Sequence, residues 1–330
     1  MSDEHARPSS VLALAGGVGA ARFLRGLSDV IEPDRITAIV NTGDDIVLHG
    51  LHVSPDLDTV MYTLAGAVNP ETGWGLTGET WNVMDALERL APTGPTGSMA
   101  GMTWFRLGDR DLATHLYRTQ RLREGAPLSA VTAELRAAWR VGVRLVPMTD
   151  DPVETRVVVA GEGEIGFQDY FVRLGHSVRV EEVRFAGATE AAAAPDVLDG
   201  ISSAQTVVIC PSNPIVSVGP ILAVAGIADA LGRRRETTIA ISPIIAGQAL
   251  KGPAARLMSE LGHEPSVIGV ARIYAPFVGA LIIDEADREL APAVEAEGMR
   301  CVVAPTVMHG APEAAALAVV VLGVASATAG

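Results

Sequence analysis

Cysteine is scarce in this sequence, which has only Cys210 and Cys301 among its 330 residues. The two lie far apart and form no CxxC pair, so no disulfide framework is expected. The first ten residues are polar and lack the basic-then-apolar order of a secretory signal. We therefore expect a reducing, cytoplasmic setting.

Positive charge is also scarce. The 25 lysines and arginines are outnumbered by 39 acidic residues, which gives a formal net charge of −14, and Lys251 is the only lysine. Such an excess of acid would repel phosphates over most of the surface, which argues against nucleic acid as a partner. A local basic pocket for one small phosphorylated ligand remains compatible with this composition.

Apolar runs suited to a membrane are few. Residues 200–228 carry no charge, but three prolines and Asn213 interrupt them, which predicts a buried strand, a polar loop and a buried helix. Residues 314–330 are at the lower length limit for a membrane span. We expect them to form a terminal helix packed on the core, and we expect no membrane partner.

The composition, with 48% hydrophobic and 19% charged residues, excludes general disorder and suits a large core. An apolar strand over 11–15, a glycine turn, a helix and a second strand over 36–40 predict a right-handed βαβ unit. The expected fold class is α/β, with a Rossmann-like, three-layer parallel sheet. Further strands are expected at 206–210, 237–241, 266–271, 280–283 and 301–304.

Residues 71–150 differ from the rest of the chain. They contain all four tryptophans of the sequence and show helical spacing over 80–90 and 111–141. We interpret them as a mostly helical insertion that contributes to a substrate site. Residues 1–70 and 151–330 would then form the Rossmann-like nucleotide-binding core.

The glycine turn at 16–19 lies where the first strand meets the first helix. Gly17 and Gly19 would let backbone N–H groups approach a phosphate at the helix N-terminus. No GK[ST] follows, so this is not a Walker loop, and Arg22 stands where a dinucleotide fingerprint needs its third glycine. The alternative is a tight turn that binds no ligand.

Four carboxylates, Asp44, Asp45, Asp56 and Asp58, lie close together in the sequence on loops beside this turn. A hard cation such as Mg²⁺ would relieve their repulsion and could bridge a diphosphate. Asp45 and Asp58 are the preferred metal ligands and catalytic carboxylates. The alternative is that Asp58 caps a helix and Asp44 shapes a turn.

Polar loops follow two later strands and suit recognition of a base and a ribose. Their candidate nucleotide-binding residues are Ser212, Asn213, Ser242 and Gly247, and plain turn chemistry is the alternative for each loop. His115 is predicted to be a surface or packing residue. The sequence lacks G-x-S-x-G, HExxH and cysteine–histidine metal spacings, which favours metal-assisted transfer at phosphorus over covalent catalysis.

Several of these motifs belong to a larger ordered set. It comprises GGVG at 16–19, NTGDD at 41–45, SPDLDT at 54–59, WG at 74–75, LGDRDLATH at 107–115, PMTDDPV at 147–153, FQD at 167–169, PSNP at 211–214 and SPI at 242–244. Together, over residues 11–309, they resemble the 2-phospho-L-lactate transferase family of coenzyme F420 biosynthesis. The resemblance is strongest to the actinobacterial branch of that family.

This resemblance implies a Mg²⁺-dependent, homodimeric transferase that acts on Fo, a deazaflavin with a ribitol chain. The donor would be a guanosine diphosphate ester of a three-carbon acid, enolpyruvyl in the actinobacterial branch and lactyl in the archaeal one. Transfer to the ribitol hydroxyl would release GMP and, with the enolpyruvyl donor, give dehydro coenzyme F420-0. In the family, the positions of Asp58 and Arg106 are associated with Fo binding. We expect Thr42 and Trp74 on the same side, although Trp74 would serve equally well as a core residue.

Two other classes of function remain open at this stage. A related family of sugar-nucleotide-binding regulators shares the glycine turn and an aspartate-rich second loop, and would bind a nucleotide without turnover. A nicotinamide-dependent oxidoreductase is the other, and the broken fingerprint at Arg22 argues against it. The choice between enolpyruvyl and lactyl donors is left open, because no motif reports it.

Overall fold

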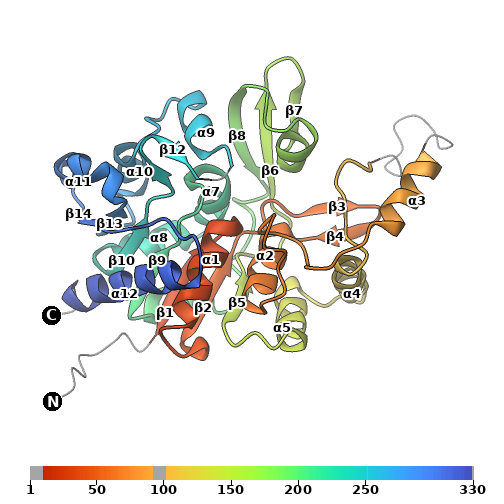
Figure 1. Ribbon diagram of the computed structural model, residues 1–330, viewed down its shortest axis with the longest axis horizontal. Helices are drawn as coiled ribbons and strands as arrows, with labels where there is room; N and C mark the ends of the chain where they lie inside the picture. The colour runs from red at the N-terminus through yellow and green to blue at the C-terminus, as the bar shows by residue number, and fades with distance from the viewer. Residues whose placement is uncertain (1–9, 92–101, 251, 329–330) are drawn as a thin grey trace.

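The computed structural model describes residues 10–91, 102–250 and 252–328. Its centre is a seven-stranded parallel sheet in the order β14-β13-β10-β9-β1-β2-β5 (Figure 1). The predicted α/β fold is therefore confirmed. The strands are β1 Val11–Ala15, β2 Ile36–Val40, β5 Arg144–Pro147, β9 Thr206–Ile209, β10 Thr238–Ile241, β13 Ala280–Ile283 and β14 Arg300–Val303.

Helices cover both faces of this sheet, because alternate side chains of each strand point to opposite sides. Val11 and Ala13 of β1 face one apolar core, and Leu12 and Leu14 face the other. The first core is covered by α1 Gly17–Ser28, α2 Pro55–Leu64, α5 Leu128–Ala138 and α12 Ala311–Thr328. The second is covered by α6 Val197–Ser203, α7 Gly219–Ala223, α8 Ile227–Arg233, α9 Ala254–Glu260, α10 Val267–Tyr274 and α11 Ala291–Ala296.

The apolar C-terminal segment is a helix packed on the core, as the sequence predicts. Leu317 and Val321 of α12 are buried, and α12 lies against α1. A methyl group added at Gly26 of α1 would lie 2.2 Å from the carbonyl carbon of Ala314, so glycine allows this close helix contact. Among the described residues, no helix combines the length and the apolar character that crossing a membrane requires.

One expected strand is wrong, because residues 267–274 form α10. The hydroxyl of Ser266 accepts hydrogen bonds from the N–H groups of Ile268 and Gly269, which is an N-cap. A short, continuous apolar run does not distinguish a strand from a buried helix. The serine before the run was the signal that favours the helix.

Smaller elements stand above the carboxyl edge of the main sheet. The hairpin of β3 Ile46–Leu48 and β4 Leu51–Val53 packs with α3 Asn82–Leu90 and lies against α4 Asp111–Arg123, and it forms an arm at the right of Figure 1. A three-stranded antiparallel sheet holds β6 Glu154–Val159, β7 Gly163–Gly166 and β8 Val180–Ala186. A two-stranded ladder joins β11 Ile244–Ile245 to β12 Gln248–Ala249.

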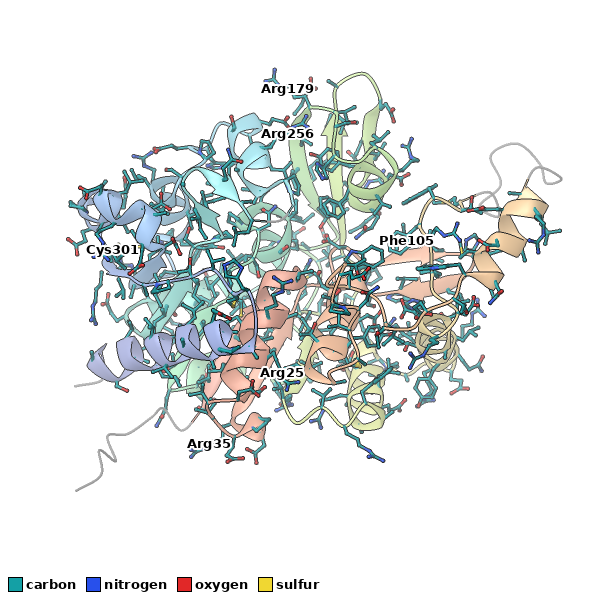
Figure 2. All side chains as sticks on the ribbon, viewed as in Figure 1. Arg25, Arg35, Phe105, Arg179, Arg256 and Cys301 are labelled. Carbon is teal, nitrogen blue, oxygen red and sulfur yellow. The ribbon has the colours of Figure 1, made fainter. Side chains whose placement is uncertain are left out.

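The division into a core and an insertion stays a prediction. Within 71–150, α3, α4 and α5 are helical as expected, but β5 pairs with β2 and extends the main sheet. Figure 2 shows Phe105 in the arm and Cys301 on β14 at the opposite end of the molecule. Cys301 and the buried Cys210 are both free thiols.

The strand order creates a switch point between β1 and β9. From β1 the chain runs outward to β2 and β5 on one side, and β9 begins the series on the other side. Open parallel sheets bind ligands at the carboxyl ends of the strands beside such a point. The loops after β1, β2 and β9 are therefore where a ligand is expected.

Candidate functional site

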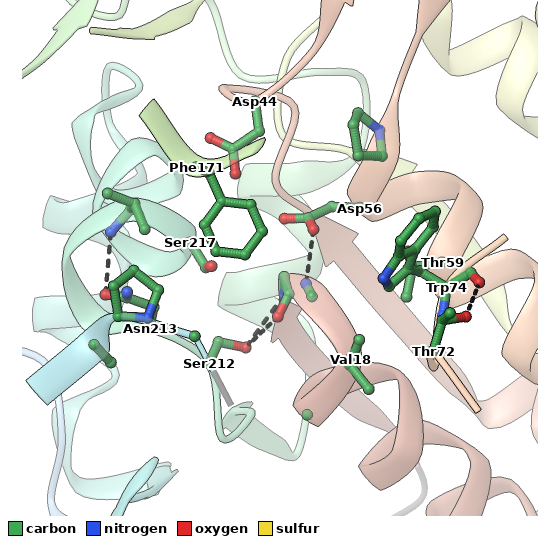
Figure 3. Close-up of a pocket in the computed structure, with 18 of the residues that line it drawn as sticks. Val18, Asp44, Asp56, Thr59, Thr72, Trp74, Phe171, Ser212, Asn213 and Ser217 are labelled. Carbon is green, nitrogen blue, oxygen red and sulfur yellow. Dashed lines mark hydrogen bonds between the residues drawn. The ribbon is translucent and has the colours of Figure 1, made fainter. Parts of the chain in front are cut away.

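A cavity of about 720 Å³ opens at these loops (Figure 3). Its lining includes the glycine turn, the starts of α1 and α2, part of α4, and the segments after β9 and β10. The volume is within the range of about 300–1,000 Å³ that is typical of small-molecule sites. Its aromatic lining consists of Tyr62, Trp74, Trp104, Phe105, Phe167 and Phe171.

Both predicted phosphate-binding glycines, Gly17 and Gly19, line this cavity. Gly17 has a φ of +71°, and a methyl group at Gly19 would lie 2.3 Å from the carbonyl oxygen of Pro211. Backbone geometry alone therefore requires glycine at both positions. Helix α1 starts here, and the first amides of a helix have no intrahelical acceptor, so the turn can still hold an anion.

Asp44 and Asp56 both line the cavity, and Asp56 lies against the glycine turn (Figure 3). Asp56 accepts the Gly17 N–H at 2.9 Å and the Asn41 Nδ2 at 3.0 Å. Burial nevertheless raises the pKa of Asp56 to about 6. Burial and the charge of Asp56 also hold the pKa of Asp44 well above its ordinary value. One buried oxygen of Asp44, Oδ1, has no hydrogen-bond partner among the described residues.

The preferred carboxylates Asp45 and Asp58 have different surroundings. Asp45 Oδ2 accepts Ser54 Oγ at 2.7 Å and lies 2.9 Å from His52 Nε2. Asp45 lines a smaller cavity of about 230 Å³ and is not part of the lining of the larger one. Asp58 lines the larger cavity, and both of its oxygens bind the buried guanidinium of Arg118.

Sequence reasoning missed the face of α4 that meets Asp58. Asp111, His115 and Arg118 are spaced i, i+4 and i+7, so they lie on one side of the helix. His115 is fully buried, with Nδ1 3.7 Å from Asp58 and Nε2 3.2 Å from Asp111. Tyr62 donates its hydroxyl to Asp111 at 2.5 Å.

The charges of this cluster largely compensate one another. Burial raises the pKa of Asp58, and the charge of Arg118 opposes that rise. The pKa of Asp111 is lowered despite its burial, chiefly by its hydrogen bond with His115. Ligand atoms of Asp58, Asp111 and His115 lie within 4.8 Å of one another, a spacing that could hold a metal ion. Because Arg118 already neutralises Asp58, hydrogen bonding is the better-supported role of the cluster.

Of the other predicted Fo-side residues, Trp74 and Arg106 line the cavity and Thr42 does not. Trp74 lines it and is 51% exposed. Arg106 also lines it, but its guanidinium pairs with Asp85 at 2.5 Å and Glu88 at 2.9 Å. Thr42 is buried, outside the lining, and accepts the Asp45 N–H through its backbone oxygen at 3.2 Å.

Three of the four predicted nucleotide-side residues, Ser212, Asn213 and Ser242, line the cavity. Ser212 Oγ donates to the Gly16 carbonyl at 2.9 Å, and Asn213 Oδ1 accepts the Ile215 N–H at the same distance. Ser242 Oγ bonds within its own loop. Gly247 lies outside the lining and has a φ of +73° in the turn between β11 and β12. That turn accounts for its glycine.

Comparisons with known proteins agree on one family. A family model described as 2-phospho-L-lactate transferase CofD matches residues 11–310. The chain is 47% identical over 312 residues to a protein of Streptomyces griseus named phosphoenolpyruvate transferase, covering 93% of this chain and 96% of that one. It is 40% identical over 320 residues to a protein of the same name from Mycolicibacterium smegmatis, covering 93% and 95%.

The fold has solved neighbours as well. The crystal structure of a UPF0052-family protein from Bacillus halodurans superposes with a TM-score of 0.59 at 16% identity. The match covers 95% of this chain and 99% of that chain. At this identity the likeness concerns the fold alone, and it supports the three-layer arrangement of helices around a parallel sheet.

Proposed function

Because the chain belongs to the 2-phospho-L-lactate transferase family, we propose that it moves a phosphoenolpyruvyl or phospholactyl group from a guanosine diphosphate ester to the ribitol hydroxyl of Fo, with release of GMP. The observation that carries this proposal is the cavity at the switch point, where a helix N-terminus lies beside buried carboxylates and polar loops. The names of the curated relatives favour the enolpyruvyl donor. That donor would give dehydro coenzyme F420-0.

The donor is proposed to bind across the glycine turn. Its diphosphate would meet the first amides of α1, where the helix dipole favours negative charge. Ser212, Asn213 and Ser242 line the adjacent wall and would hold the guanosine. Gly247 would shape its loop without touching the ligand.

The acceptor is proposed to lie on the α4 side. Arg118 binds both oxygens of Asp58 and so fixes the orientation of this carboxylate. Asp58 would accept hydrogen bonds from the ribitol hydroxyls and would take the proton that the attacking hydroxyl releases. His115 and Asp111 extend this polar wall. Trp74, at the half-exposed rim, would cover the deazaflavin ring and help to exclude water. Arg106 would contribute to the rim beside it.

Mg²⁺ fits this site best at Asp44 and Asp56. Both carboxylates are buried, the charge of Asp56 helps to raise the pKa of Asp44, and Asp44 Oδ1, which has no hydrogen-bond partner among the described residues, is available as a ligand for a cation. Mg²⁺ prefers such anionic oxygens and, when bound, would neutralise diphosphate charge. Asp45 and Asp58 remain the alternative pair, although other side chains already bind their oxygens.

The setting is proposed to be cytoplasmic and the assembly homodimeric, with no nucleic-acid or membrane partner. The formal charge of −14 supports small-molecule rather than nucleic-acid substrates.

Mass spectrometry of the product tests the proposal. The purified protein is incubated with Fo, Mg²⁺ and each guanosine diphosphate ester in turn, and the two products differ by two hydrogen atoms. We expect the dehydro product and GMP with the enolpyruvyl donor. Nucleotide binding without any product would contradict the transferase function and favour a non-catalytic nucleotide-binding regulator.

A further inference from the structure

Asp56 occupies the position at the start of α1 that a phosphate oxygen would otherwise take. Its carboxylate accepts the Gly17 N–H and the Asn41 side-chain amide (Figure 3). A helix N-terminus attracts an anion through its free amides, and here the protein supplies that anion itself. Asp56 is 8% exposed and lines the cavity, so its charge faces the space that the donor would enter.

Nothing in the described part of the chain neutralises this charge. Asp44 adds a second buried carboxylate, and no ion pair involves either residue within the ranges that the structure describes. The arginines of the described lining, Arg22 and Arg106, are directed elsewhere. Arg22 Nη1 donates to the Met308 carbonyl at 3.3 Å, and Arg106 pairs with acidic residues of α3. A diphosphate at the glycine turn would therefore meet two uncompensated carboxylates.

We propose that Asp56 makes nucleotide binding conditional on a divalent cation. The inference rests on the proposed function, and it adds a coupling between two ligands of that site. Without a cation, Asp56 competes with the phosphate for the Gly17 N–H and repels it. With a cation between Asp44 and Asp56, the same carboxylates hold a positive charge beside the helix start, and the diphosphate is attracted. By linkage, the nucleotide must raise the affinity for the cation by the same factor.

The affinity for GDP, measured by calorimetry in EDTA and in saturating Mg²⁺, tests this coupling. For the wild type we expect Mg²⁺ to raise the affinity on the order of tenfold or more, as is usual for coupled sites. Asp56→Asn removes the charge and keeps an oxygen for the Gly17 N–H. It should bind GDP more tightly than the wild type in EDTA and more weakly in Mg²⁺, so the effect of the substitution changes sign.

Asp150→Asn is the matched control. Asp150 accepts the Ser129 N–H at 2.6 Å near the start of α5, and it lines neither cavity. The variant therefore removes one carboxylate from another helix start and should keep the wild-type response to Mg²⁺. Loss of the response in Asp150→Asn as well would overturn the specific role of Asp56.

The remaining outcomes separate this inference from the proposed function. A wild type that binds GDP equally well in both conditions overturns the coupling and leaves the transferase function standing. A wild type that binds no GDP in either condition overturns the proposed nucleotide site. If Asp56→Asn does not fold, Asp44→Asn takes its place and must lose part of the Mg²⁺ response; an unchanged response in that variant overturns the inference.

Discussion

Asp56→Asn should stabilise the cation-free protein at neutral pH, although it removes a carboxylate from a helix start, where negative charge is usually favourable. Burial raises the pKa of Asp56 from 3.8 to about 6. Each pKa unit corresponds to about 1.4 kcal/mol, so keeping this carboxylate charged in the folded state costs up to about 3 kcal/mol. Asparagine carries no charge at any pH and avoids this cost.

The pH dependence gives the sign of the effect. Because the folded-state pKa is raised, the folded protein binds a proton more readily than the unfolded chain between the two pKa values, 3.8 and about 6. The contribution of Asp56 to stability therefore falls as pH rises through that window, and the full penalty applies above it. The advantage of the variant should be greatest at about pH 7.5 and about half as large at about pH 5.

Thermal unfolding in EDTA measures this difference. For a chain of this length, about 3 kcal/mol corresponds to roughly 4 °C in Tm. Saturating Mg²⁺ should reverse the order, because only the wild type gains the carboxylate–cation interaction. A variant that is less stable than the wild type in EDTA at neutral pH, or a difference that does not change with pH, would refute the reasoning.

Three further experiments test other parts of the structure. Arg118→Ala should lower the free energy of unfolding by about 3–5 kcal/mol, because it leaves Asp58 buried and unpaired, and adding Asp58→Asn should restore part of the loss in urea unfolding. Gly19→Ala should destabilise the protein through its 2.3 Å approach to a backbone oxygen, whereas Gly323→Ala, with open space around it in α12, should stabilise it by about 0.5–1 kcal/mol in the same assay. Asn213→Ala should raise the apparent KM for the donor in steady-state kinetics and leave the KM for Fo nearly unchanged. A loss of thermal stability alone would mean that Asn213 only stabilises its own turn.

The sequence was sufficient to predict the position of the cavity. Apolar strands followed by glycine or polar loops placed the ligand at the carboxyl edge of a parallel sheet, and the structure has its larger cavity there. The surroundings of the adjacent acids Asp44 and Asp45 could not be predicted in the same way. The direction of each side chain depends on the dihedral angles of the loop. Here Asp44 lines both cavities, whereas Asp45 lines only the smaller one.

Only part of the cluster on α4 could be predicted from the sequence. The spacing of Asp111, His115 and Arg118 could have been recognised as one helix face. Their partner Asp58 lies far away along the chain, and its contact with Arg118 depends on how α2 and α4 pack. Helical periodicity identifies a face, but it does not say which residue of another element meets that face.

The geometry of α2 shows how one short motif could contact both of the proposed substrates. Pro55 is the first residue of this helix, so Asp56 and Asp58 both lie in its first turn. Residues two positions apart on an α-helix are rotated by about 200° about its axis, so their side chains leave on nearly opposite sides. Asp56 accordingly meets the glycine turn of α1, and Asp58 meets Arg118 of α4. A shift of α2 would therefore move both aspartates together. A substitution at Asp56 or Asp58 that displaces α2 should change the binding of both proposed substrates. A substitution that leaves α2 in place should change the binding of only one.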